Sequence, residues 1–360
     1  MKVESERQLA EAVRDATEPL QIVGGGTRPV GAGVGRQLEV AIRGVSLYEP
    51  AALTLVVGAG TPLREVEALL AAEGQRLPFE PVRWGPVLGA KGESTIGGVV
   101  AANVSGPRRV QAGACRDSLI GVRFVDGTGA SVKNGGRVMK NVTGYDLVKL
   151  LAGSWGTLGV LSEVSFKLLP AAYTHATLVL PDLTAGDAVA ALAVALGSPY
   201  DVTGAGWLPG EGALIRVEGL ADSVAYRAGR LAETLGRFGA IRIEREGGAT
   251  LWHDLGEVAP FKGRPGNLWR FSVKPSDAPG LVARLGCPVV LDWGGGLVWA
   301  LTAEGVDART QAAPFGGHAT LMRGSGAGVF HPEPAPLAAL ARGLRARFDP
   351  RGIFNPGRMG

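Results

Sequence analysis

The chain carries, at residues 144–164, the stretch GYDLVKLLAGSWGTLGVLSEV. Residues 146–152 predict a short helix, and residues 160–168 alternate apolar and polar side chains as a half-buried strand does. Gly153, Gly156 and Gly159 recur every three residues between them. A single such segment is explained by a tight helix-to-strand turn. Whether it has a functional role therefore depends on the glycine-rich segments elsewhere in the chain.

A second segment, GGGTRPVGAG at 24–33, follows a predicted strand at 20–23. Backbone N–H groups of Gly24, Gly25 and Gly26, with the Thr27 hydroxyl, suit a pyrophosphate. A Rossmann fingerprint starting at Gly24 would need glycine at Pro29, and residues 28–37 lack a helical period. We therefore expect no helix dipole to hold the anion here. A glycine turn between two strands is the alternative.

A third segment, STIGGVVAANVSGPRR at 94–109, is dominated by small residues that leave room for a flat ring and a phosphate chain. Adjacent glycines and β-branched residues disfavour a helix in it. Residues 58–61 look similar, but Thr61 and Pro62 are typical of a helix start. They predict a helix with Thr61 as its N-cap that ends at Gly74, so we interpret this stretch as structural.

Composition excludes several classes of protein. Of 360 residues, 46% are hydrophobic and 19% charged, which excludes a mainly disordered chain, and the 56 glycines show no G-X-Y period, which excludes collagen. A net charge of +4 without a basic run indicates no nucleic-acid partner. Cys115 and Cys287 form neither a disulfide framework nor a zinc motif. The longest apolar run, 188–196, is half a membrane span, and the start is not a signal peptide, so we expect a cytoplasmic protein with no transmembrane segment.

Two domains are expected, since one core rarely grows beyond roughly 250–300 residues. After Pro170, predicted strands and helices follow a β-α-β-β-α-β order at 174–181, 185–196, 202–208, 213–218, 221–237 and 240–245. The pattern partly continues through 267–274, 278–285, 288–293 and 297–302, and a last helix is predicted at 335–347. We place the domains at 1–171 and 172–330, with a C-terminal segment, 331–360, that returns to the first domain.

In their order and spacing, the three glycine-rich segments resemble the FAD-binding fold of the vanillyl-alcohol-oxidase type, also called the PCMH type. GTLGV with GYDL upstream is typical of that group, and MKNV with GGHAT narrows the resemblance to the FAD-binding subunits of bacterial glycolate oxidase. Further matching stretches are PLREVEALLAAEGQRLPFEP, SGPRR, LWRFSVKPSDAP, DWGGGLVW and FDPRGIFNPGRM. The resemblance implies an α+β fold, in which a PCMH-type FAD-binding domain of two α/β subdomains is joined to a ferredoxin-like antiparallel sheet-and-helix cap domain for the substrate.

The resemblance also implies which residues would hold FAD. The first loop would cradle the pyrophosphate, the second would line the cofactor, residues near 160 would lie along the adenine, and a C-terminal asparagine would return to the flavin domain. In that order, these residues are Gly24, Gly25, Gly26, Thr27 and Arg28; Thr95, Ile96, Gly97, Gly98, Ala102, Ser105 and Gly106; Gly159 and Val160; and Asn355. Many relatives bond FAD through a histidine in the first loop. Thr27 or a neighbouring residue stands there in this chain, so the resemblance implies non-covalent FAD.

Candidates for substrate chemistry are fewer. The four histidines lack ligand spacing, so no metal site is expected. His318, in GGHAT, is the candidate base, with a histidine bonded to backbone in a turn as the alternative. Arg270 and Arg323 are candidates for a substrate carboxylate, because a guanidinium fork binds carboxylates bidentately. For each of them a surface or interdomain ion pair is the favoured alternative.

The function implied is that of an FAD-binding redox subunit in a glycolate (2-hydroxy acid) oxidase or dehydrogenase complex, which oxidises glycolate to glyoxylate with electron transfer through the flavin. The expected partners are a second FAD-containing catalytic subunit and an iron–sulfur subunit, through which the chain would associate with the inner membrane. One alternative is a stand-alone FAD dehydrogenase for another small 2-hydroxy acid. The other is a non-catalytic structural subunit that keeps the flavoprotein fold.

Overall fold

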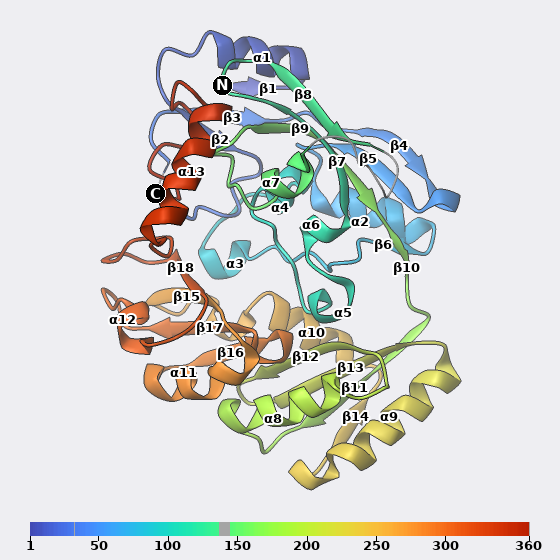
Figure 1. Ribbon diagram of the computed structural model, residues 1–360. Coiled ribbons are helices and arrows are strands. Elements are labelled where there is room, and N and C mark those ends of the chain that lie inside the picture. The colour runs from blue at the N-terminus through green and yellow to red at the C-terminus, as the bar shows by residue number, and fades with distance from the viewer. Residues whose placement is uncertain (32, 137–144, 360) are drawn as a thin grey trace.

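The computed structural model describes residues 1–31, 33–136 and 145–359 (Figure 1). Its strands before residue 171 form small sheets, and its strands from residue 174 onward form one sheet of eight. The two parts lie one above the other in Figure 1. The MKNV motif at 139–142 and Gly144 of GYDL lie outside the described residues.

The first part contains two main sheets. A parallel three-stranded sheet has the order β1-β3-β2, and an antiparallel five-stranded sheet has the order β4-β5-β9-β7-β8. A short antiparallel pair, β6 and β10, forms a separate two-stranded sheet. The strands are β1 (Lys2–Val3), β2 (Leu20–Val23), β3 (Arg36–Val40), β4 (Val45–Glu49), β5 (Thr54–Gly58), β6 (Gln75–Arg76), β7 (Leu119–Val125), β8 (Ser131–Gly135), β9 (Val160–Lys167) and β10 (Leu169–Pro170).

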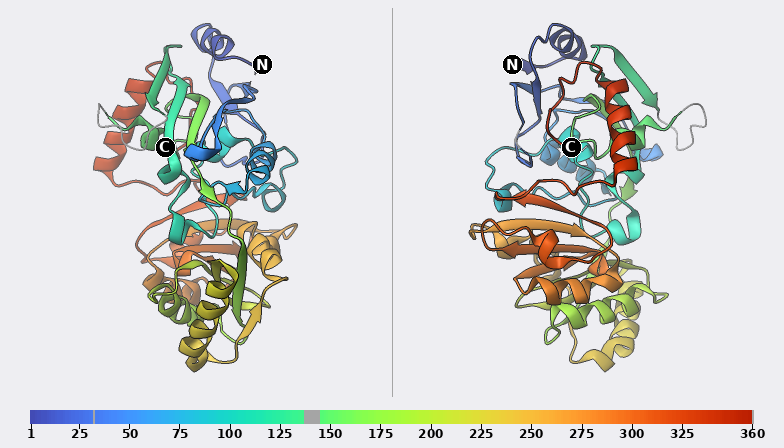
Figure 2. Two further views of the ribbon diagram at one scale, coloured as in Figure 1. Left: turned by 90° about the vertical axis from the view of Figure 1, so that its right-hand side faces the viewer. Right: turned by 60° about the vertical axis from the view of Figure 1, so that its left-hand side comes forward.

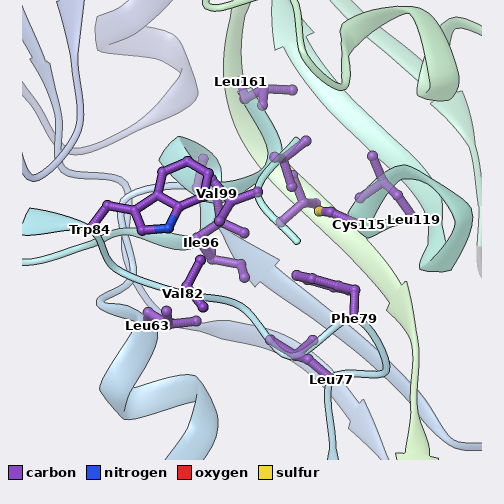
Figure 3. Close-up of a cluster of buried hydrophobic side chains, with 14 of the residues drawn as sticks. Leu63, Leu77, Phe79, Val82, Trp84, Ile96, Val99, Cys115, Leu119 and Leu161 are labelled. Carbon is purple, nitrogen blue, oxygen red and sulfur yellow. The ribbon is translucent and has the colours of Figure 1, made fainter. Parts of the chain in front are cut away.

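Short helices surround these sheets and enclose a common apolar core. Phe79, Trp84, Ile96 and Val99 meet in it, as Figure 3 shows, and each of these side chains is almost fully buried. The helices are α1 (Glu6–Arg14), α2 (Leu63–Ala72), α3 (Gly85–Leu88), α4 (Ile96–Ala101), α5 (Arg109–Ala112), α6 (Cys115–Ser118) and α7 (Leu147–Leu151).

Two local predictions were wrong. Residues 96–101 form helix α4 despite their glycines, because the Thr95 hydroxyl accepts the Gly98 N–H at 3.3 Å and Ile96, Val99 and Val100 are buried. Thr61 does not cap α2: its hydroxyl accepts the Gly44 N–H at 3.0 Å, and Pro62 takes the N-cap position. In both cases contacts from elsewhere in the chain decide the local structure.

The eight-stranded sheet consists of two ferredoxin-like units. The first has the predicted β-α-β-β-α-β order and the spatial order β14-β11-β13-β12; the second, β15-α11-β16-β17-α12-β18, repeats this arrangement as β18-β15-β17-β16. Strands β12 and β16 join the units edge to edge at Trp207 and Leu291. The elements are β11 (Thr174–Leu180), α8 (Ala185–Leu196), β12 (Val202–Leu208), β13 (Gly212–Gly219), α9 (Ala221–Leu235), β14 (Arg242–Glu244), α10 (Gly248–Gly256), β15 (Asn267–Ser272), α11 (Ala278–Leu285), β16 (Val289–Asp292), β17 (Leu297–Thr302), α12 (Ala308–Ala312) and β18 (His318–Arg323).

Helices α8, α9 and α11 cover the face of this sheet that points away from the first part, so its other face is turned toward the first part (Figures 1 and 2). The chain then returns. Helix α13 (Ala335–Phe348) packs Phe348 against Phe124, and the Leu20 N–H donates to the Ile353 carbonyl at 2.7 Å. The boundaries placed at 171 and 330 stay a prediction.

A buried ion network joins the two parts, which we call the interdomain ion network: Arg108, Glu80, Arg216 and Glu218. Arg216, on β13, donates two hydrogen bonds to Glu80, at 2.9 and 2.7 Å. Arg108 makes a bidentate pair with Glu218, on the same strand, with one bond at 2.6 Å. The Arg216 and Glu218 side chains are 4% and 7% exposed. Removing one partner from such a pair leaves a charge buried without compensation.

The substitution Glu218→Gln should therefore lower the free energy of unfolding by roughly 3 kcal/mol, because Arg108 loses its bidentate carboxylate in a dry site. Denaturant unfolding of the full chain measures this. Glu211→Gln is the matched control: Glu211 pairs with Arg242 at 3.3 Å, but both side chains are about half exposed, and we expect at most about 0.5 kcal/mol. Equal effects of the two substitutions would contradict the structural role of the network.

Candidate functional site

The three glycine-rich segments line a single cavity of about 280 Å³. It brings together the end of β2, the start of α4 and the turn before β9. The residues predicted to hold FAD that line it are Gly24, Gly25, Gly26, Thr27, Arg28, Thr95, Gly97, Gly98, Ala102, Gly159 and Val160. Three stretches that lie far apart in the sequence thus share one site.

Four residues predicted to hold FAD lie beside this cavity. The Ile96 side chain is fully buried in the core. The Ser105 hydroxyl accepts the Cys115 N–H at 3.0 Å, and the Gly106 carbonyl accepts the Trp293 indole N–H at 3.0 Å. Asn355 accepts the Ile22 N–H at 2.9 Å and donates to the Trp155 carbonyl at 2.9 Å, so it fixes β2 and the 155–156 turn in the cavity wall. These four residues therefore contact other parts of the protein and do not line the cavity.

Glycine is required where these segments touch. A Cβ atom on Gly25 would overlap the Glu93 carbonyl, and one on Gly92 would overlap the Gly25 carbonyl, so the two backbones are in direct contact. A Cβ on Gly97 would lie 2.7 Å from the Ala59 carbonyl oxygen. Gly26, with φ +68°, would have no atom within 4 Å of its Cβ. The first loop is therefore packed tightly on one side and open on the other.

Two arginines supply positive charge to the cavity wall. Arg28 donates to the Val82 carbonyl at 2.8 Å, and Arg358 donates to the Gly31 carbonyl at 2.8 Å. The Nε–H of each is buried and has no partner within the described residues. Burial lowers the pKa of Arg28 to about 10, which keeps it charged at neutral pH. A cavity with uncompensated guanidinium donors suits an anionic ligand such as a dinucleotide pyrophosphate.

Sequence reasoning missed several lining residues. Arg358 lies three residues after Asn355 in the NPGRM stretch, and a basic residue there was an available signal. Ala59 lines the cavity from the stretch 58–61 interpreted as structural. Trp155 contributes from the residues directly before the GTLGV motif, at a left-handed φ of +53°. The cavity wall is thus wider than the glycine motifs alone indicated.

The arginines predicted to bind substrate lie outside this cavity, at the junction of the two parts. The Cζ atom of Arg270, on β15, is 5.8 Å from the Trp84 ring centroid and 5.2 Å from that of Trp293. Arg323, on β18, donates to the carbonyls of Val87 and Arg264. Arg323 thus links β18 to α3 through a hydrogen bond, while the Arg270 guanidinium lies near the rings of Trp84 and Trp293.

His318 begins the edge strand β18, opposite Ser272 of β15. His318 is exposed at the start of this strand. Partial desolvation of its ring nevertheless lowers the pKa of His318, and the positive charges of Arg270, His331 and Arg109 lower it further. At neutral pH the imidazole is therefore uncharged and able to accept a proton. Among the described residues, no three His, Cys, Asp or Glu side chains gather as a metal site. In that part of the chain, no helix is long and apolar enough to cross a membrane.

Comparison of the sequence with known proteins identifies the family to which the chain belongs. A family model described as "FAD binding domain" matches residues 1–135. Over 362 aligned residues the chain is 40% identical to "Glycolate oxidase subunit GlcE" of Escherichia coli strain K12, which covers 98% of this chain and 95% of that protein.

Other relatives match over shorter stretches. The chain is 43% identical over 86 residues to "Glycolate oxidase subunit GlcD" of Bacillus subtilis strain 168, which is 24% of this chain and 18% of that protein. It is 31% identical over 134 residues to a D-lactate dehydrogenase of Archaeoglobus fulgidus, which is 37% of this chain and 28% of that protein. A solved structure of alkyldihydroxyacetonephosphate synthase superposes with a TM-score of 0.68 at 17% identity, over 99% of this chain and 76% of that one. The predicted α+β, PCMH-type fold is confirmed.

The backbone contact at Gly25 gives a direct test of the cavity. Gly25→Ala should lower the free energy of unfolding by about 1–3 kcal/mol and separate the first loop from residues 92–93, so the purified chain should retain little FAD. Visible absorbance per chain after gel filtration measures this. The control is Gly229→Ala on α9, where an added Cβ meets no atom within 4 Å. Full FAD retention by the Gly25 variant would argue against the cavity as the cofactor site.

Proposed function

Since this chain belongs to the family of FAD-linked glycolate oxidase subunits, we propose that it is the FAD-binding redox subunit of a glycolate oxidase complex, which oxidises glycolate to glyoxylate. The observation that carries this proposal is 40% identity along 95% of the Escherichia coli subunit, combined with one cavity lined by all three glycine-rich segments. The chain is an FAD-linked oxidoreductase by family.

The residues present fit FAD. The first loop offers side-chain-free backbone and the buried Arg28 and Arg358 donors for the pyrophosphate. Small residues, among them Gly97, Gly98 and Ala102, leave space for a flat ring. When bound, FAD supplies the acceptor for the hydride of a 2-hydroxy acid. By resemblance, Thr27 or a neighbouring residue stands where many relatives carry the histidine used for covalent attachment, so we propose that FAD is held non-covalently.

We assign substrate roles to two residues at the junction. His318 is uncharged at neutral pH and would take the substrate hydroxyl proton as the general base. Arg270 would bind the substrate carboxylate, since its guanidinium lies against tryptophan rings and makes no hydrogen bond or ion pair within the described residues. Two of the Arg323 nitrogens are occupied by backbone carbonyls, so this residue would position β18.

The relatives' names also bear on assembly. Both bacterial relatives are described as subunits, and this chain is proposed to work in a multisubunit complex. A second FAD-containing catalytic subunit and an iron–sulfur subunit are the proposed partners. A cytoplasmic location, with association at the inner membrane through those partners, stays a prediction. A stand-alone dehydrogenase for another small 2-hydroxy acid and a non-catalytic structural subunit are the competing functions.

The visible spectrum of the purified chain separates these functions. We expect a yellow protein whose flavin remains in the supernatant after acid precipitation, and whose flavin is bleached by anaerobic glycolate only when the partner subunits are present. Bleaching of the isolated chain by glycolate or D-lactate would favour the stand-alone enzyme. A chain that stays colourless with added FAD would favour the structural subunit.

The base assignment predicts a pH dependence. Protonation of His318 removes its basicity, and its pKa lies below the ordinary 6.5, so complex turnover should fall only below that pH. His318→Gln should lower kcat about 100-fold and flatten this acid limb, because glutamine cannot accept the proton. Steady-state rates across pH 5 to 8 test this. His253→Gln, at an exposed histidine on α10, is the control. Unchanged turnover in the His318 variant would remove it as the base.

A further inference from the structure

Helix α13 shows the reverse of the side-chain arrangement that is usual for a surface helix. Its leucines, Leu337, Leu340 and Leu344, are 54%, 66% and 41% exposed, and none of its residues is fully buried. Its alanines Ala338 and Ala341, by contrast, are partly buried. A surface helix normally turns its leucines toward the core, because leucine is among the most buried residue types. The large apolar side chains of α13 therefore point away from the chain's own core.

These leucines form one continuous stripe, which we call the leucine stripe: Leu337, Leu340 and Leu344. Their spacing of three and four residues places them on one face of the helix. Helix α13 lies on the outside of the first part of the molecule (Figures 1 and 2). Among the described residues, Leu220 at the start of α9 is the one exposed leucine outside the stripe. The exposed leucines are thus gathered on α13, as at a docking surface.

The contacts that hold α13 are concentrated at its C-terminal end. Phe348 packs against Phe124 with ring centroids 6.1 Å apart, and the Gly127 N–H donates to the Phe348 carbonyl at 2.7 Å. Arg345 donates to the Met359 carbonyl. A helix of this length depends on packing of its apolar face for stability. A surface that covered the leucine stripe would therefore stabilise the part of the helix that has few contacts of its own.

Charges of opposite sign flank the leucine stripe. Glu333 lies seven residues before Leu340, just ahead of the helix, and Arg347 lies seven residues after it. Both charged side chains are exposed. At 1.5 Å per residue, Arg347 is about 10 Å from Leu340 along the helix axis. The stripe thus has an acidic end and a basic end placed evenly about Leu340, which is the pattern of a self-complementary surface.

We propose that the leucine stripe is the docking surface for a second copy of this chain. The two α13 helices lie antiparallel, related by a two-fold axis at Leu340. In this arrangement Leu337 faces Leu344 of the second copy, and Arg347 faces Glu333 of the second copy. Each apolar contact and each charge pair occurs twice, as the symmetry of such an interface requires.

The charges favour this antiparallel arrangement over other pairings of the same helix. A parallel two-fold pair would place Arg347 beside Arg347 of the second copy, and like charges at that distance repel. In the antiparallel pair, Arg342 faces Ala338 of the second copy and meets no like charge. The seam is short, so we expect a weak dimer whose population depends on protein concentration.

Sedimentation velocity of the full-length chain, from about 5 to 200 µM, measures this dimer. We expect Leu340→Asp to raise its Kd about 100-fold, because the substitution removes two buried leucines at the axis and opposes two carboxylates there. Leu220→Asp is the matched control: Leu220 is 64% exposed but lies on the other part of the molecule, and its Kd should stay within about twofold of wild type.

A charge exchange tests the antiparallel register separately. Arg347→Glu should raise the dimer Kd about tenfold, because it places two acidic side chains together at both ends of the seam. Adding Glu333→Arg to that variant should return the Kd to within about threefold of wild type, since the pair is restored with its signs exchanged. A helix that is merely destabilised by the first substitution would not be rescued by the second. All of these positions are exposed, and circular dichroism should match that of the wild-type chain.

Several outcomes would overturn the proposal. The wild-type chain could remain monomeric at about 200 µM, Leu340→Asp could match the Leu220→Asp control, or the double variant could dimerise no better than Arg347→Glu. A monomer that floats with vesicles of phosphatidylcholine and phosphatidylglycerol would assign the stripe to a lipid surface instead. The dimer is read from molecular mass and not from FAD content or glycolate oxidation, so this test is independent of the proposed function.

Discussion

Direct backbone contact between the first loop and residues 92–93 is the constraint on which the cavity depends. Gly25 touches the Glu93 carbonyl, and Gly92 touches Gly25 in return, with no room for a Cβ atom on either. Side chains there would push the loops apart and open the cavity wall. This contact explains part of the high glycine content, because glycine permits backbones to approach closely while it costs conformational entropy in the unfolded chain.

The second constraint is the buried charge at the junction of the two parts. Arg216 with Glu80 and Arg108 with Glu218 satisfy one another across it. Such pairs add little net stability over an apolar contact, but they tolerate no mismatch, so they favour one docking geometry. That geometry also places Arg109, which follows Arg108 directly, against the Trp293 ring on the opposite side of the junction.

The eight-stranded sheet shows how the fold presents residues to that junction. Its two ferredoxin-like units share one face that α8, α9 and α11 cover. The opposite face, on which α10 packs Trp252 against Arg216, carries Arg216, Glu218 and Arg270 toward the first part. Edge strand β18 carries His318 at its start and Arg323 at its end. Because side chains alternate along a strand, Arg216 and Glu218, which lie two positions apart on β13, point to the same face of the sheet.

Local sequence patterns determined the order of elements, because strand and helix periods and turn residues act over a few positions. The β-α-β-β-α-β order and the 160–168 strand were both predictable in this way. Tertiary structure alone decided that residues 96–101 are helical, that Arg358 enters the cavity, and that Arg109 and Arg270 meet at Trp293. These outcomes depend on burial and on charges that lie far apart in the chain, and no short-range pattern encodes which distant groups will come together.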